Sequence, residues 1–179
     1  PQLQLLDNIL SKEVDDTGLL QERLVEVCVV GTYIKRQSNL LILREDKGIF
    51  SAKELEYCLR ESVEAISQGK ITASLKATCK GSIKAVNAVL IYDLYEDIIE
   101  TILPSLEALF INLNISKGLV KLKLQIDADK EEQALGKLNK KKLKSIEQLA
   151  KKGGYIKIEE EDGSLAIAIE LPKAGEGVC

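Results

Sequence analysis

Histidine and tryptophan are absent from this 179-residue chain, and aromatic residues make up only 4% of it. Any reaction that needs an imidazole of this chain as a general base or a phosphate acceptor is therefore excluded. The cysteines are Cys28, Cys58, Cys79 and Cys179, with no Cys-x-x-Cys spacing. Without histidines to join them in a zinc site, they are expected to be free thiols in a reducing cytoplasm.

The sequence also has no surplus of basic residues and no long apolar run. The formal net charge is −3, whereas nucleic-acid binding requires a basic surface that neutralises phosphates. No apolar run approaches the roughly 18 residues that cross a bilayer, and no signal peptide is recognisable. We therefore expect a cytoplasmic chain that contacts neither nucleic acid nor membrane, which leaves room for a membrane anchor in a longer protein.

The first 47 residues favour helices. Apolar residues recur at helical spacing in 3–13 and, after a break at 15–18, in the proline-free stretch 19–44. This stretch has a heptad seam of Leu20, Leu24, Val27, Gly31, Ile34, Ser38 and Leu41, and a second stripe of Val30, Tyr33, Gln37 and Leu40. Two stripes require more than one neighbour, so we predict a helical hairpin that forms a homodimer through helix 19–44. The alternative is a monomeric core helix.

From Ser51 onward the pattern changes to mixed helices and strands. Ser51 and Glu54 form a capping box, strict alternation in 71–79 predicts a half-buried strand, and Pro104 ends a helix that Ser82 can cap. The expected order is helix 51–69, strand 71–79, helix 82–103, strands 108–114 and 119–126, helix 130–152, and strands 155–159 and 165–171.

Hairpins among these strands and the lack of strict βαβ alternation predict an α+β two-layer sandwich. We expect a five-stranded mixed sheet with three helices on one face, spanning residues 48–179. It follows a helical dimerisation segment, residues 1–47, with a hinge at 45–48.

This order of elements resembles the ATPase fold shared by sensor histidine kinases and DNA gyrase. Residues 94–103 correspond to the kinase helix that carries a metal-binding asparagine, and 126–129 to the strand end with an adenine-recognising aspartate. Residues 153–158 are similar to the start of the closing hairpin. Residues 31–39 resemble the second dimerisation helix of a Gram-positive branch of these kinases. The resemblance is to the cytoplasmic portion of such a kinase.

The resemblance implies a set of site residues for ATP and Mg²⁺. Glu96 and Glu100 share one helical face and match the acidic residue and the asparagine of the kinase helix, so Glu96 would be the catalytic acid and Glu100 the metal ligand. Asp127 or Asp129 would contact adenine, with Gly153 and Gly154 beside the cofactor. The alternatives are that these glutamates are solvated helix residues and that Asp127 is an ordinary turn residue.

The chain departs from the kinase pattern at three points. Glu100 replaces the asparagine, and a carboxylate about 4 Å from a phosphate repels it by about 1 kcal/mol in water and about 4 kcal/mol at an effective dielectric of 20. No glycine follows Asp127 before Gly136, and a left-handed backbone without glycine costs roughly 1–2 kcal/mol. The glycine-rich phosphate loop is replaced by a lysine-rich segment, 129–152, which could hold phosphates, meet an acidic receiver domain, or be a solvated helix.

Two functions follow from the resemblance. The first is phosphoryl transfer from ATP to a histidine upstream of Pro1, since the chain has none, and then to the receiver domain of a response regulator. The second is a catalytically inactive, dimeric signalling module that binds ATP weakly or not at all.

Overall fold

The computed structural model describes residues 2–11, 17–116, 118–129, 136, 138, 144–161 and 164–173. The helices are α1 (Gln2–Leu10), α2 (Thr17–Lys47), α3 (Ala52–Ile66), α4 (Ala85–Ile102) and α6 (Lys144–Lys151), with the 3₁₀ turn η1 (Leu103–Ser105). The strands are β1 (Ile49–Ser51), β2 (Thr72–Cys79), β3 (Ser82–Lys84), β4 (Leu106–Ile115), β5 (Leu119–Ala128), β6 (Tyr155–Glu161) and β7 (Ser164–Pro172).

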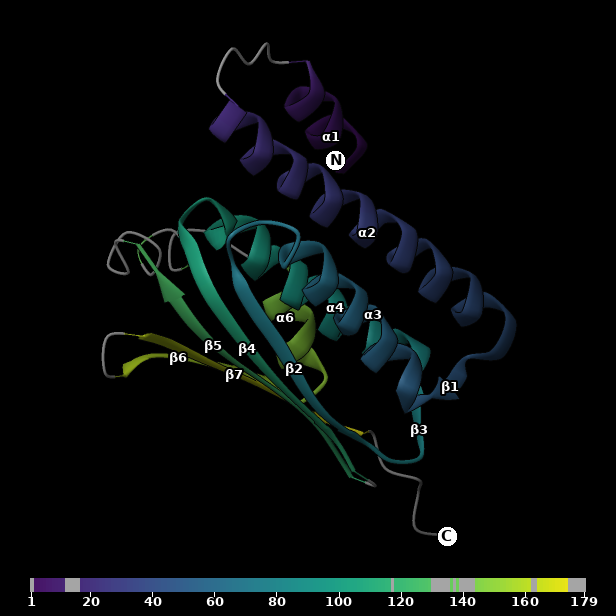
Figure 1. Cartoon of the computed structure of the whole chain (residues 1–179). Helices are drawn as coiled ribbons and strands as arrows, with labels where there is room; N and C mark the ends of the chain where they lie inside the picture. Colours follow the sequence, from purple (N-terminus) through teal and green to yellow (C-terminus); the bar gives the residue numbers. More distant parts are fainter. Residues whose placement is uncertain are drawn as a thin grey trace, which may run out of the picture.

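Five of the strands form one mixed sheet in the order β2-β4-β5-β7-β6. The β2–β4 pair is parallel, and the β4–β5, β5–β7 and β6–β7 pairs are antiparallel. Helices α3, α4 and α6 lie on one face of the sheet, and α2 with α1 lies beyond α3 and α4 (Figure 1). The predicted two-layer sandwich with a mixed five-stranded sheet is therefore confirmed.

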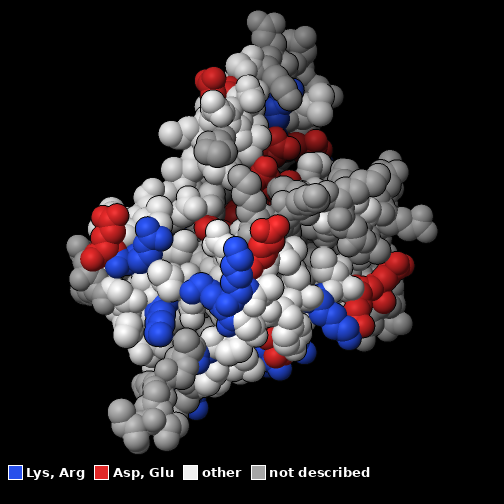
Figure 2. Space-filling view, turned by 180° about the vertical axis from the view of Figure 1, so that it is seen from behind, with Lys and Arg blue, Asp and Glu red and all other residues white. Residues whose placement is uncertain are grey.

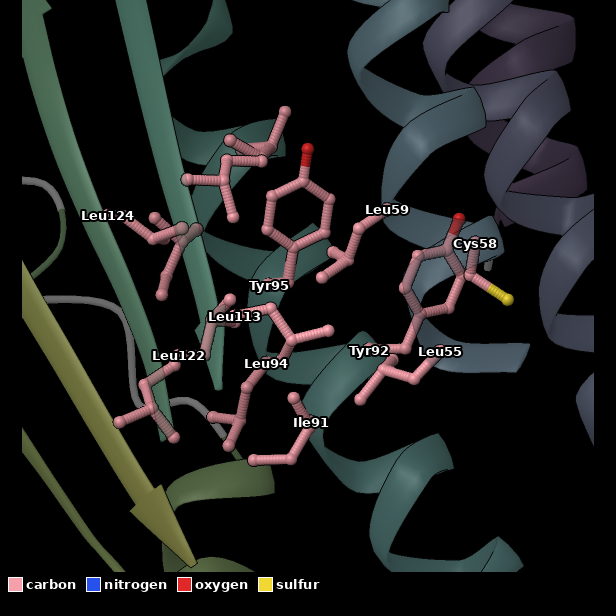
Figure 3. Packing of buried hydrophobic residues seen from close by; sticks show 14 of the residues in the cluster. Leu55, Cys58, Leu59, Ile91, Tyr92, Leu94, Tyr95, Leu113, Leu122 and Leu124 are labelled. Carbon is pink, nitrogen blue, oxygen red and sulfur yellow. The ribbon is translucent and has the colours of Figure 1, made fainter. Parts of the chain in front are cut away.

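The core lies between the sheet and the helices because both contribute apolar surfaces. Alternate residues of β4 and β5, such as Leu113 and Leu122, are fully buried, as expected for strands with one covered face. Helix α4 is apolar on most of its circumference, which fits a helix with neighbours on several sides. Figure 3 shows the Tyr95 ring between the sheet and Leu59 of α3, whereas Tyr92 lies toward Leu55 and Cys58 of α3.

Some element boundaries differ from the prediction. Helix α4 begins at Ala85 and not at Ser82, because residues 82–84 form β3, which pairs with β1 in a small antiparallel sheet. Ser51 is the N-cap of α3 as predicted, since the Lys53 amide donates to Ser51 Oγ at 3.3 Å, whereas the contribution of Glu54 to a capping box stays a prediction. Most of the predicted helix 130–152 lies outside the described residues, which include only α6 and residues 136 and 138.

Helix α2 presents two different faces. Residues of one face are buried against the domain: Val25, Val29, Val30, Tyr33 and Leu40. This face includes three members of the second predicted stripe. On the heptad seam, by contrast, Leu20 and Leu24 are 48% and 55% exposed. The domain thus covers the second stripe and leaves the start of the seam open.

Ion pairs also connect α2 with α3. Glu61 of α3 accepts from both Arg36 and Lys35 of α2, and the Lys35 Nζ–Glu61 Oε2 distance is 3.2 Å.

Within the described part of the chain, no helix combines the length and the apolar character needed to cross a membrane.

Candidate functional site

Glu96 lies in the interior of the protein, on the face of α4 toward α2 and α3. Only 5% of the residue is exposed. Ser62 Oγ donates to Glu96 Oε1 at 3.3 Å and lies 3.0 Å from the Tyr95 hydroxyl. Burial raises the pKa of Glu96 to about 8, although the Ser62 and Tyr92 hydroxyls favour the charged form. The Glu96 side chain is therefore a neutral carboxylic acid at pH 7.

Glu100 lies one turn further along α4 and is exposed. Its Oε2 accepts from Gln2 Nε2 of α1 at 3.2 Å. Glu96 and Glu100 both line a cavity of about 240 Å³ between α4, η1 and the two N-terminal helices. Figure 2 shows acidic atoms set back from the surface below the N-terminal helices. The two glutamates predicted from the sequence therefore line the same cavity.

The surroundings of Glu96 do not fit a metal ion. Metal ligands must be deprotonated, whereas burial raises the pKa of Glu96 and disfavours the carboxylate. Among the described residues, no group of three or more histidine, cysteine, aspartate or glutamate side chains is arranged to hold a metal. A single carboxylate such as Glu100 fits Mg²⁺ only when nucleotide phosphates and water complete the coordination.

Asp127 lies on the opposite face of the sheet from α4. It alternates with the buried residues Ile126 and Ala128 on β5 and pairs with Ala108 of β4, so its side chain points away from the helices. Asp129 follows the strand, is exposed, and donates its amide to the Ser105 carbonyl at 2.8 Å. The structure therefore does not bring Asp127 together with Glu96 and Glu100.

Gly153 and Gly154 end helix α6 and lead into β6. Gly153 has φ +74°, its amide donates to the Ala150 carbonyl, and the Gly154 amide donates to the Leu149 carbonyl. These two bonds are those of a Schellman motif. A Cβ on Gly154 would lie 2.7 Å from the Glu170 carbonyl oxygen. Both glycines thus have a structural role, and their predicted place beside a cofactor stays a prediction.

Two further acids of α4 were missed by the sequence reasoning. Asp93 and Asp97 repeat the spacing of four residues. Asp93 accepts from the Tyr33 hydroxyl at 3.1 Å and from Gln37 Nε2 at 3.0 Å, both on α2. Asp97 instead accepts from Ser145 Oγ of α6 at 3.2 Å. The same spacing rule that selected Glu96 and Glu100 could have found them, but it could not show that Asp97 faces α6.

Comparisons with known proteins identify the fold. Neither a protein-family model nor a curated protein sequence matches the chain. Among solved structures, the histidine kinase domain of a blue-light-activated kinase from Erythrobacter litoralis superposes with TM-score 0.61 at 12% identity, covering 97% of this chain and 94% of that domain. The chain has a histidine-kinase fold.

Two further structures share this histidine-kinase fold. The Acinetobacter baumannii histidine kinase AdeS has TM-score 0.50 at 14% identity, with 97% of this chain and 96% of that chain covered. A bacterial phosphotransferase has TM-score 0.52 at 8% identity, with 94% and 87% covered. At such identities the likeness concerns the fold, so the Gram-positive branch and the site residues stay predictions.

Proposed function

We propose that the chain is the cytoplasmic signalling region of a two-component sensor histidine kinase. In this proposal it transfers the γ-phosphoryl group of ATP to a histidine outside the chain, from which the group passes to a response-regulator receiver domain. The observation that supports it is the extent of the structural likeness, which includes the helices α1 and α2 as well as the α/β domain. A histidine kinase needs both parts, since one dimerises and the other binds ATP.

Within this proposal the acids of α4 have different roles. Glu100 and Asp97 are the candidates for holding Mg²⁺, which when bound neutralises charge on the ATP phosphates. Glu96 keeps its proton and acts through its hydrogen bond with Ser62. It is therefore a positioning residue for α4 and not a general base.

A second candidate function is the inactive signalling module. Two placements favour it. Asp127, the candidate adenine contact, points to the open face of the sheet, and Ala128 occupies the neighbouring position toward the helices. A carboxylate of α4 in place of the asparagine of the kinase pattern, Glu100 or Asp97, would also repel phosphates, because like charges repel. Both features lower the expected affinity for ATP.

Isothermal titration of the dimer with Mg-ATP distinguishes the two functions. A dissociation constant below about 1 mM, equivalent to roughly −4 kcal/mol, supports the kinase. Absence of heat, with the dimer retained, supports the inactive module and contradicts the kinase.

Two variants test which acid faces the phosphates. Replacing the acid that faces the phosphates with the asparagine of the kinase pattern removes one negative charge that repels ATP. This change should raise the affinity for Mg-ATP by about 1 kcal/mol, or about fivefold. We expect this gain from Asp97→Asn if the α6 side of the helix faces the nucleotide, and from Glu100→Asn if the α2 side does. Glu107→Gln, at the exposed start of β4, is the control and should leave the affinity unchanged.

A further inference from the structure

The face of the sheet opposite the helices is open and carries a row of lysines. Strand register places Lys76 of β2 opposite Asn112, Asn112 opposite Lys123, Lys123 opposite Ala168, and Ala168 opposite Lys157. Lys76, Lys123 and Lys157 are all exposed. Because paired residues of neighbouring strands point to the same side, three lysines lie in one line across five strands.

The next row adds a fourth lysine. Lys121 lies two residues before Lys123 on β5, and its Nζ contacts Glu170 Oε1 of β7 at 2.6 Å. Lys157 contacts Glu159 at 2.7 Å. The Lys157–Glu159 pair is exposed and is worth little, typically below about 1 kcal/mol, so Lys157 can exchange Glu159 for another carboxylate. The Glu170 side chain is only 16% exposed, so Lys121 contributes its charge to the face while it stays paired.

Charge is distributed unevenly along this face. The two rows of residues 121, 123, 76 and 157 carry four lysines and one acid, Glu170, whereas Glu159 follows in the next row beside Lys157, and Asp127 lies one row further along the strands. The chain as a whole has net charge −3. The lysine rows are thus a local basic patch on an acidic molecule, and they would orient a partner in one direction.

We propose that this lysine-lined sheet face, carried by Lys76, Lys121, Lys123 and Lys157, is a docking surface for an acidic segment of a partner protein. The whole face consists of the two lysine rows and two further rows, those of Gln125 and Asp127, and spans roughly 20 Å by 25 Å, about 500 Å², by strand spacing and rise. This is near the area that each partner buries in a small, transient interface. Asn112 lies between Lys76 and Lys123, Asn114 lies beside Lys121, and Gln125 is in the next row; their amides supply donors and acceptors that suit a peptide.

Two other anionic partners fit this face less well. An extended anionic bilayer would also meet Asp127 and Glu159 and be repelled by them. Single-stranded nucleic acid would use the exposed aromatic residues Phe110 and Tyr155, but these lie on β4 and β6. Three strand spacings separate them, about 14 Å, which is too far for successive bases to stack on both.

Fluorescence anisotropy of the whole chain tests this docking surface without ATP. The probe is a labelled octapeptide in which glutamate and valine alternate, with a glutamine–valine octapeptide as the neutral control. We expect binding of the acidic peptide only, and about tenfold weaker binding for Lys123→Glu. Lys53→Glu on α3, exposed and with the same charge change, should weaken it less than about twofold.

Amide chemical-shift mapping and a variant of unchanged charge complete the test. Chemical-shift perturbations by the peptide are expected on β5, β6 and β7. Ala168→Leu places a larger side chain between Lys123 and Lys157 and leaves the charge unchanged, and should weaken binding of the acidic peptide at least about threefold. The proposal is overturned if the acidic peptide does not bind, or if Lys53→Glu is as damaging as Lys123→Glu. It is also overturned if phosphatidylglycerol vesicles or oligothymidylate bind this face in preference to the peptide.

Discussion

At the scale of single residues, Glu96 is the most unusual group of the protein. A carboxyl group is rarely buried unless it is paired or neutral. Here the neighbours are hydroxyls, namely Ser62, Tyr92 and Tyr95, and not cations. Burial removes water from the carboxylate, and the hydrogen bond from Ser62 does not compensate a full charge, so the site favours the protonated form.

Stability should therefore fall as pH rises. The pKa of Glu96 is raised from 4.5 to about 8. Between these pH values the folded protein keeps a proton that the unfolded chain releases, so the free energy of unfolding decreases with each unit of increasing pH. The full cost is on the order of 5 kcal/mol. Glu96→Gln should remove most of this slope, as measured by urea unfolding at pH 5, 6.5 and 8.

The exposed Glu100→Gln serves as the matched control for this prediction and should retain the slope. Asp93, whose pKa burial also raises, leaves a smaller residual dependence in every variant. Equal slopes in wild type and Glu96→Gln would show that Glu96 ionises normally in the folded protein.

At the scale of elements, helix α2 connects two interfaces. Its buried face contacts the domain through apolar side chains, through the hydrogen bonds of Tyr33 and Gln37 to Asp93, and through the ion pairs with Glu61. Its other face exposes Leu20 and Leu24. Exposed leucines at heptad spacing are what a pairing helix presents to a second copy.

Leu24→Glu should convert the proposed dimer into a monomer. A glutamate in an apolar seam leaves a charge buried without a partner, which costs several kcal/mol per subunit. Sedimentation velocity or light scattering measures the change. Leu19→Glu introduces the same charge at a residue that is 51% exposed but off the seam, and should leave the mass unchanged. A dimer that persists in Leu24→Glu would exclude this seam as the interface.

At the scale of the whole molecule, α2 and the α/β domain share one hydrophobic core. Four buried apolar α2 residues belong to this core: Val25, Val29, Tyr33 and Leu40. At about 1.5–3 kcal/mol for each buried side chain, their contribution is roughly 6–12 kcal/mol. This is comparable to the whole stability of a typical domain, so the predicted boundary at residues 47/48 need not separate two independent folding units.

A fragment that begins at Gly48 should therefore unfold at a temperature at least about 10 °C lower than the whole chain, or self-associate through the uncovered apolar surface. Thermal unfolding followed by circular dichroism measures this. A chain that lacks only α1 is the control, because none of the residues of α1 is buried. If the fragment from Gly48 is as stable as the whole chain, residues 48–179 form an independent domain as predicted.

Much of the architecture was determined by the sequence alone. Apolar residues at every second position predicted β2, β4, β5, β6 and β7. Apolar residues at intervals of three and four predicted α2, α3 and α4, because both periods follow from local backbone geometry. The hairpins among the strands and the lack of βαβ alternation added the mixed five-stranded sheet, which the observed strand order confirms. The strands β1 and β3 were missed because three-residue strands have too few alternations to recognise.

Tertiary structure decided which acids can act together. On β5 the alternation of Leu122, Leu124 and Ile126 already placed Asp127 on the opposite face, but only the packed helices show that this face is away from α4. On α4, identical spacing selects Glu96 with Glu100 and Asp93 with Asp97. Their different environments arise from α2, α3 and α6, which come from distant parts of the chain. Local spacing sets which side chains share a face, whereas long-range packing sets what that face meets.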